Sequence, residues 1–156
     1  MTEPVIRRSF EVESPLEQAW HRLADVERWP EWAPHISLVE LSPPGELGPT
    51  SRGALHIKLL GRNTFRMSAW QPPSRWEWVG GLPGLRIYYD HRFESAGPAS
   101  TRLEWVVTLR GPISPLIRRV FARVYGRKLD LAIPRLQEWF RATATRTATR
   151  QSIDGR

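Results

Sequence analysis

The sequence predicts an α+β fold in which a curved antiparallel sheet of about seven strands wraps around a long C-terminal helix. Between residues 35 and 109, short segments of alternating apolar and polar residues are separated by turns rich in Gly and Pro. Such segments are typical of antiparallel strands joined by hairpins. From Ile113 onward, apolar residues recur every three or four positions, as in an amphipathic helix. A sheet with an apolar face must be covered, and this helix is the segment long enough to cover it.

The chain before this sheet predicts one strand and two short helices. Residues 4–13 alternate, which indicates a half-buried strand. Arg8 falls among its apolar positions, so we expect it either to reach the strand edge and water or to pair with a carboxylate. The Ser-Pro pair at residues 14–15 suits the cap and first position of a helix. Asp25 is a second cap, opening a short helix that runs to about Glu31.

Six strands and one long helix are expected to follow. The strands span residues 35–41, 53–59, 64–70, 75–79, 85–94 and 101–109. The helix spans residues 113–140, with a kink near residues 130–134 because Pro134 removes a backbone hydrogen bond. We therefore expect one domain, residues 1–140, followed by a polar basic tail, residues 141–156, that is frayed or disordered.

Composition limits the class of protein. The 156 residues are 40% hydrophobic and contain no apolar run near the roughly 20 residues that a membrane span needs. No stretch reads as a signal peptide, so we expect a cytoplasmic protein. The chain has no Cys, which excludes disulfides and thiolate metal sites. Eight Trp residues are many for this length and predict an aromatic-rich core or pocket.

The formal net charge of +7 is concentrated near the C-terminus. Residues 110–156 carry ten Arg and one Lys against three acidic residues, whereas residues 1–109 are nearly neutral. This pattern is typical of a solvated, Arg-rich helix face. It also allows weak contact with nucleic acid or an anionic membrane, although no aromatic residue is interleaved with the tail arginines to stack on bases. The sequence does not determine the oligomeric state.

Several local segments resemble one known superfamily. Residues 10–20 (FEVESPLEQAW) resemble its first strand and Pro-started helix, and residues 25–34 (DVERWPEWAP) its second helix. Residues 70–78 (WQPPSRWEW) are similar to its central hairpin, and residues 100–103 (STRL) to the start of its last strand. The chain thus resembles, over residues 4–140, the START-like or SRPBCC superfamily, also described as polyketide cyclase/dehydrase-like or birch-allergen-like. This resemblance implies a helix-grip fold with a cavity between sheet and C-terminal helix.

Alternation also indicates which side chains face that cavity. In the last two strands the inner face holds Tyr89, His91 and Trp105. Apolar neighbours should keep His91 neutral, so it exchanges one hydrogen bond with a ligand or is a core histidine bonded to protein. His35 lies where the resemblance places the cavity mouth, and it either binds ligand or is an exposed loop residue. The expected ligand-binding residues are Trp32, His35, Trp76, Trp78, Tyr89, His91, Trp105, Val120 and Val124.

Motifs for specific chemistry are missing from the sequence. It has no phosphate-cradling Gly loop, no Gly-x-Ser-x-Gly elbow and no His pair at metal-ligand spacing. We therefore expect no metal and no cofactor. Whether the chain is an enzyme stays open, with His91 and Tyr89 as the candidate catalytic residues.

Three functions remain compatible with the sequence. The first is binding, with transport or modification, of a mostly apolar small molecule such as a lipid, quinone or aromatic polyketide. It requires a buried cavity on the order of several hundred Å³. The second is a polyketide cyclase/dehydratase-type enzyme in which His91 and Tyr89 polarise a carbonyl or move a proton. The third is a ribosome- or membrane-associating module that docks through the basic C-terminal helix.

Overall fold

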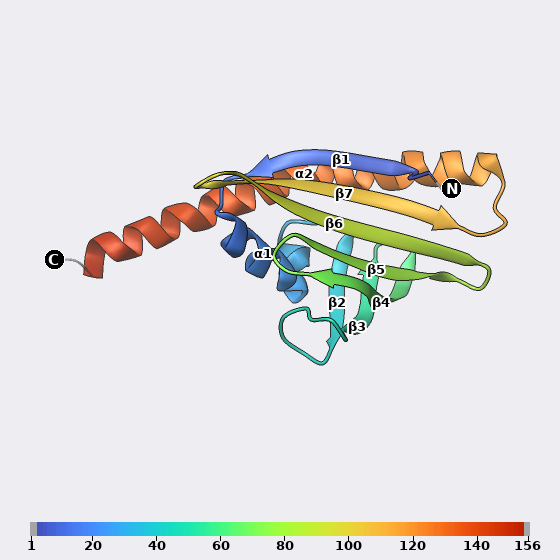
Figure 1. The fold of residues 1–156 in the computed structure, drawn as a ribbon, viewed down its shortest axis with the longest axis horizontal. Coiled ribbons are helices and arrows are strands. Elements are labelled where there is room, and N and C mark those ends of the chain that lie inside the picture. Colours follow the sequence, from blue (N-terminus) through green and yellow to red (C-terminus); the bar gives the residue numbers. More distant parts are fainter. Residues whose placement is uncertain (1–2, 155–156) are drawn as a thin grey trace.

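A seven-stranded antiparallel sheet curves around one long helix, as the sequence predicts (Figure 1). The computed structural model describes residues 3–154, apart from the side chains of residues 147–149, 151 and 154. The strand order is β1-β7-β6-β5-β4-β3-β2. The strands are β1 (Ile6–Val12), β2 (Ile36–Ser42), β3 (Arg52–Ile57), β4 (Gly61–Gln71), β5 (Arg75–Leu82), β6 (Leu85–Gly97) and β7 (Ser100–Arg110). The helices are α1 (Leu16–Ala24), the 3-10 helix η1 (Val26–Glu31) and α2 (Pro115–Asp154).

Alternation in the strands sorts their side chains between the two faces of the sheet. On β7, Leu103, Trp105 and Val107 are buried, whereas Arg102 points to solvent and Glu104 is half-buried. The outer face carries ion pairs instead; Asp90, for example, accepts hydrogen bonds from the guanidinium of Arg75. One face of the sheet is therefore apolar, and the helices cover it.

The main core cluster lies where α1 meets the sheet. The ring centroid of Trp20 lies 4.9 Å from that of Trp76 and 5.1 Å from those of Trp70 and Phe93. Trp76 is completely buried. These four rings pack against one another at this end of the sheet, beneath α1.

Helix α2 presents different faces to the sheet and to solvent. Its inner face buries Tyr125, Leu129, Ala132, Leu136 and Phe140 at helical spacing. The guanidinium Nε of Arg8 donates a 2.6 Å hydrogen bond to Asp130 Oδ1, which ties β1 to the middle of the helix. Arg8 therefore pairs with a carboxylate rather than simply reaching water.

Helix α2 extends beyond residue 140, the end that the sequence predicts for it. The helix continues without interruption through Pro134 to Asp154, and its red end extends beyond the sheet (Figure 1). Ala residues favour helix, and the hydroxyl of Thr143 donates to the carbonyl of Trp139 at 2.8 Å, which suits Thr to a helical position. Residues 155–156 of the predicted tail lie outside the described residues. None of the described helices has an apolar stretch long enough to cross a membrane.

Candidate ligand-binding site

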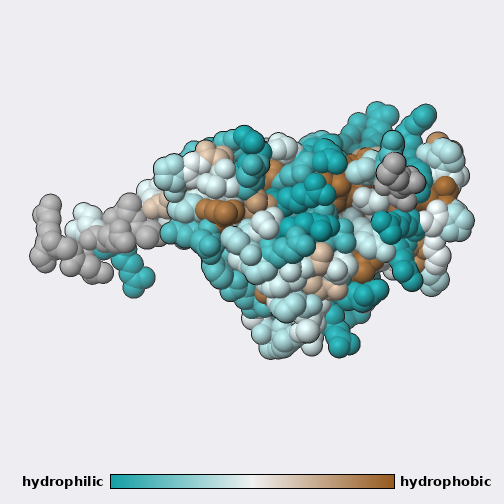
Figure 2. All heavy atoms as spheres, viewed as in Figure 1, coloured by the Kyte–Doolittle hydropathy of each residue, from teal (hydrophilic) through white to brown (hydrophobic). Residues whose placement is uncertain are grey.

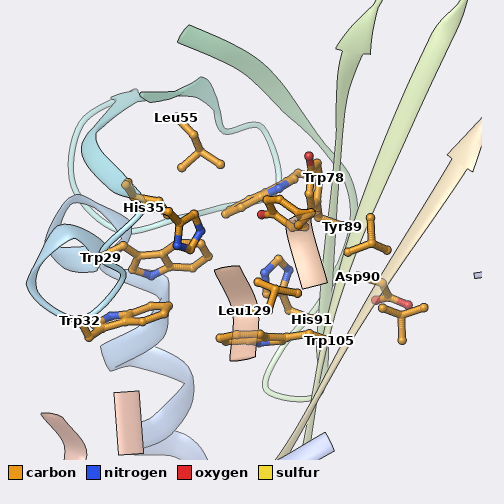
Figure 3. Close-up of a pocket in the computed structure, with 14 residues that line it drawn as sticks. Trp29, Trp32, His35, Leu55, Trp78, Tyr89, Asp90, His91, Trp105 and Leu129 are labelled. Atoms are coloured by element: carbon orange, nitrogen blue, oxygen red, sulfur yellow. The ribbon is translucent and has the colours of Figure 1, made fainter. Parts of the chain in front are cut away.

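A small pocket lies between the inner face of the sheet and the first half of α2 (Figure 3). Trp29, Trp32 and His35 project into it from η1 and the segment before β2, opposite side chains of β5, β6 and β7. Its complete lining is Trp29, Trp32, His35, Ile36, Leu55, Trp78, Tyr89, Asp90, His91, Trp105, Val106, Val107, Tyr125 and Leu129.

Aromatic rings form most of the pocket wall. The rings of Trp32 and Trp105 stack at 6.0 Å with an interplanar angle of 28°. The Trp78 ring lies 5.2 Å from that of Trp29 and 4.9 Å from that of His91. Flat walls of this kind suit planar or elongated apolar molecules.

Four buried nitrogen atoms in this wall have no hydrogen-bond partner among the described residues. They are Nε1 of Trp32 and Trp78 and Nδ1 of His35 and His91. By contrast, Nε1 of Trp29 donates to the carbonyl of Leu23 at 2.9 Å. Leaving a buried polar group unpaired costs about 1–3 kcal/mol, so most such groups in folded proteins find a partner. Four of the five such nitrogen atoms among the described residues therefore lie around one void, and the fifth, Nε1 of Trp76, lies in the neighbouring core.

Burial keeps the two histidines and two tyrosines of the pocket neutral at pH 7, whereas the Asp90 carboxylate pairs with Arg75 and Arg92 on the outer face of the sheet. Burial lowers the pKa of His91 to about 4, against a smaller opposing effect of Asp90. Burial also lowers the pKa of His35 to about 4, and the nearby positive charge of Lys128 adds to this shift. For Tyr89 and Tyr125, burial raises the pKa above the ordinary range. The site therefore offers neutral donors and acceptors and does not favour a charged ligand group.

The void itself measures about 30 Å³, which is room for about one water molecule. The expectation of several hundred Å³ is therefore wrong for this conformation. The reason is that the lining aromatic residues also fill the space. The Tyr125 ring lies 6.0 Å from that of His35 and 5.9 Å from that of Tyr89. The Tyr125 ring, which the helix supplies, thus fills space beside both His35 and Tyr89.

The structure brings together most of the predicted ligand-binding residues. Those that line the pocket are Trp32, His35, Trp78, Tyr89, His91 and Trp105. Trp76 lies beside them, with its ring 5.3 Å from that of His91, but it belongs to the core under α1. The prediction for Val120 and Val124 is wrong, because they are 53% and 49% exposed on the outer side of α2. Tyr89 and His91 form no hydrogen bond between their side chains, so the structure contains no preformed dyad of these two residues.

The ligand-binding prediction missed four main contributors. These are Trp29, Leu55, Tyr125 and Leu129. Tyr125 and Leu129 belong to a helical stripe that continues through Ala132 and Leu136, and that spacing could have identified them. Among the side chains that the structure describes, no group of three or more His, Asp or Glu residues is arranged to hold a metal ion.

Comparison with known families agrees with this architecture. A family model described as polyketide cyclase / dehydrase and lipid transport matches residues 3–137. The chain belongs to this family. The START-like resemblance noted in the sequence is thereby confirmed. Membership of the polyketide cyclase/dehydrase and lipid transport family suggests a role in binding a hydrophobic ligand or a cyclase-like role.

Solved structures of low sequence identity share the fold. A START superfamily protein from Mycobacterium smegmatis is 15% identical, with a TM-score of 0.65 over 88% of this chain and 97% of that one. A Thermobifida fusca protein is 18% identical, with a TM-score of 0.68 over 86% and 91% of the two chains. The di-domain ARO/CYC protein StfQ of the steffimycin biosynthetic pathway is 13% identical, with a TM-score of 0.69 over 90% of this chain and 51% of StfQ. No curated protein sequence is significantly similar to this chain.

Proposed function

We propose that this protein binds a flat, mostly apolar small molecule that carries hydrogen-bond acceptors, such as a quinone or an aromatic polyketide. The observation that carries the proposal is the set of four unpaired nitrogen atoms in an otherwise aromatic wall. An indole N–H donates only, so Trp32 and Trp78 call for an acceptor such as a carbonyl oxygen. The rings around them call for a planar hydrocarbon frame. Ligand entry displaces Tyr125, since the void holds about one water molecule.

Menadione, a methylated naphthoquinone, is a suitable probe, and 2-methylnaphthalene is its matched control without carbonyl groups. In a ¹H–¹⁵N NMR titration, the indole N–H signals of Trp32 and Trp78 should shift on addition of menadione. The signal of Trp29 should move less, because its N–H is already bonded to Leu23. Affinity for 2-methylnaphthalene should be about two- to tenfold weaker per lost neutral hydrogen bond.

Variants then distinguish the contribution of the indole N–H donors to binding from that of the aromatic pocket wall. Trp32→Phe and Trp78→Phe should each weaken menadione binding about two- to tenfold and leave 2-methylnaphthalene binding less affected. Trp70→Phe, which lies outside the pocket lining, is the matched control. The proposal is rejected if menadione moves none of these indole signals up to its solubility limit and native mass spectrometry of the purified protein finds no bound small molecule.

The His91 side chain favours a second candidate, proton transfer of the cyclase/dehydratase type. The geometry carries this candidate: Nδ1 of His91 is buried in the pocket wall without a hydrogen-bond partner among the described residues, so it can accept a proton from a bound molecule. Burial lowers the pKa of His91 to about 4, so the ring is neutral at pH 7 and a weaker base than a solvated imidazole. A bound ketone would then exchange its α protons faster than in buffer. Deuterium incorporation into 2-tetralone, followed by NMR, tests this. Equal rates with wild type and His91→Ala would remove the assignment.

A further inference from the structure

Large apolar side chains are exposed at one end of the molecule. Because the strands run antiparallel in sequence order, the β3–β4 turn, the β5–β6 turn and the start of α2 all lie at the same end of the sheet. We call the exposed apolar residues there the end surface. They are Leu59, Leu60, Leu82, Leu116, Ile117, Val120 and Val124, with exposed fractions from 49% to 99%. Figure 2 shows brown, hydrophobic atoms among hydrophilic ones at that end, at right, and others across the middle of the molecule.

The β3–β4 turn carries the most exposed of these residues. Leu59 is 99% exposed and has a φ of 70°, a left-handed conformation that Leu rarely adopts. Gly or Asn would suit that position better and would not expose an apolar side chain. An almost fully exposed Leu59 adds little packing to the folded chain, which favours a role for this side chain in contact with another molecule.

Helix α2 has a second apolar stripe, separate from the one that covers the sheet. Leu116, Val120 and Val124 follow one another at intervals of four residues and therefore lie on one side of the helix. Tyr125 and Leu129 point to the opposite side, into the pocket. A helix that is apolar on both sides is usually covered on both.

The surroundings of the end surface are strongly basic. From Arg110 to Leu129 the chain has no Asp or Glu. Arg119, Arg123 and Arg127 follow the exposed stripe along α2, and none forms an ion pair among the described residues. The turn at Leu59 and Leu60 is likewise preceded by Lys58 and followed by Arg62, the latter paired with Glu40.

The end surface adjoins the pocket. The backbone N–H of Lys58, next to Leu59, donates to the carbonyl of His35 at 2.9 Å, and the His35 ring contacts that of Tyr125. The β5–β6 turn meets the start of the α2 segment, where a Cβ on Gly111 would lie 2.1 Å from the carbonyl oxygen of Gly84. The β3–β4 turn is thus joined to a residue of the pocket, and the β5–β6 turn to the segment that leads into α2.

We propose that the end surface docks on the surface of an anionic phospholipid bilayer. The leucines and valines would enter the acyl boundary while the arginines contact lipid phosphates, as in an interfacial amphipathic helix. A second copy of this chain is a poor occupant, because two such surfaces would bring like charges together. Nucleic acid would engage the arginines but leave the apolar stripe exposed to water. The docking does not require the pocket to hold a ligand, so it stands or falls separately from the menadione experiment.

Flotation of the full chain with vesicles tests this assignment. The protein should bind vesicles of phosphatidylcholine with 30 mol% phosphatidylglycerol, bind pure phosphatidylcholine at least tenfold more weakly, and dissociate as NaCl is raised. The variant Leu116→Gln/Val120→Gln/Val124→Gln should lose at least tenfold in affinity. Ile153→Gln is its matched control: Ile153 is 69% exposed on the same helix, roughly 40 Å further along at 1.5 Å per residue.

Two charge-reversal variants distinguish vesicle binding through the end surface from vesicle binding through the basic tail. Arg119→Glu/Arg123→Glu should abolish vesicle binding, whereas Arg146→Glu/Arg150→Glu should retain most of it. All of these positions are exposed, so circular dichroism melts should stay close to wild type. The proposal is overturned if the wild type does not float at low salt, or if the tail variant loses as much as the α2 variant. It is also overturned if the Gln variant instead dissolves a dimer, or if an RNA oligonucleotide binds where vesicles do not.

Discussion

This protein should lose stability between pH 7 and pH 5, and replacing His91 by Leu should make that loss much smaller. Burial lowers the pKa of His91 in the folded protein to about 4, from an ordinary 6.5. Between these values the unfolded chain binds a proton at this side chain and the folded chain does not. Unfolding therefore takes up a proton, and the free energy of unfolding falls as the pH drops from about 6.5 toward 4.

The size of the effect follows from the two pKa values. At pH 5 the loss is about 2 kcal/mol relative to pH 7, and it approaches about 3 kcal/mol near pH 4. His35 has a similarly lowered pKa and should contribute in the same direction. The losses from two such groups are together a large part of the free energy of unfolding, which is typically about 5–15 kcal/mol for a domain. The wild type should therefore approach acid unfolding near pH 4.

Urea titrations followed by tryptophan fluorescence at pH 7, 6 and 5 give the free energies. His91→Leu should lose about 2 kcal/mol less than wild type between pH 7 and pH 5, and His91→Leu/His35→Leu less again. Ile153→Gln, an exposed substitution that removes no titratable group, keeps both buried imidazoles and should retain the wild-type fall. If wild type and His91→Leu decline in parallel, burial does not depress the pKa of His91 and the neutral-pocket argument fails.

Three further substitutions test other parts of the structure. Trp76→Ala should cost about 3–5 kcal/mol in urea unfolding, because its fully buried ring contacts Trp20 and Phe93 at 4.9 Å. Asp90→Asn should cost about 1–3 kcal/mol, since this 5% exposed carboxylate accepts from two arginines at 2.8 and 2.9 Å. Leu59→Asn should raise the free energy of unfolding by about 0.5–1 kcal/mol in the same assay, because Asn tolerates the left-handed backbone, while it weakens vesicle binding.

The sheet was the most predictable part of the molecule because one rule, alternation, decides it. Each segment with period two became a strand, and Gly or Pro marked the turns between them except the β3–β4 turn, which consists of Lys58, Leu59 and Leu60 and leaves Gly61 in β4. The end of α2 was less predictable. The Ala, Thr and Arg repeat after Phe140 has few apolar anchors, which predicts fraying, yet local propensity and hydroxyl-to-backbone bonds such as that of Thr143 continue the helix.

The site residues on the strands could be predicted from the alternation of side chains, whereas those on α2 could not. Successive side chains of a strand point to opposite faces of the sheet, so Tyr89, His91 and Trp105 could be assigned together to the inner face. A helix has a full circle of directions, and α2 is apolar along two of them. Its sequence therefore contains two candidate stripes, and the one with Val124 faces outward while the one with Tyr125 faces the pocket.

The size of the pocket could not be predicted from the sequence, for a different reason. The same rings that predict an aromatic cavity wall are large enough to occupy the cavity, and periodicity reports direction but not distance. Whether Tyr125 lies against His35 or away from it is decided by how closely the first half of α2 approaches the sheet. That approach is set by contacts on both sides of Tyr125: Asp130 pairs with Arg8 of β1, and the guanidinium of Arg118, in the first turn of α2, donates to the carbonyl of Leu109 at 3.2 Å. Both contacts join residues of different elements, so periodicity along the chain contains neither of them and could not predict a void of 30 Å³.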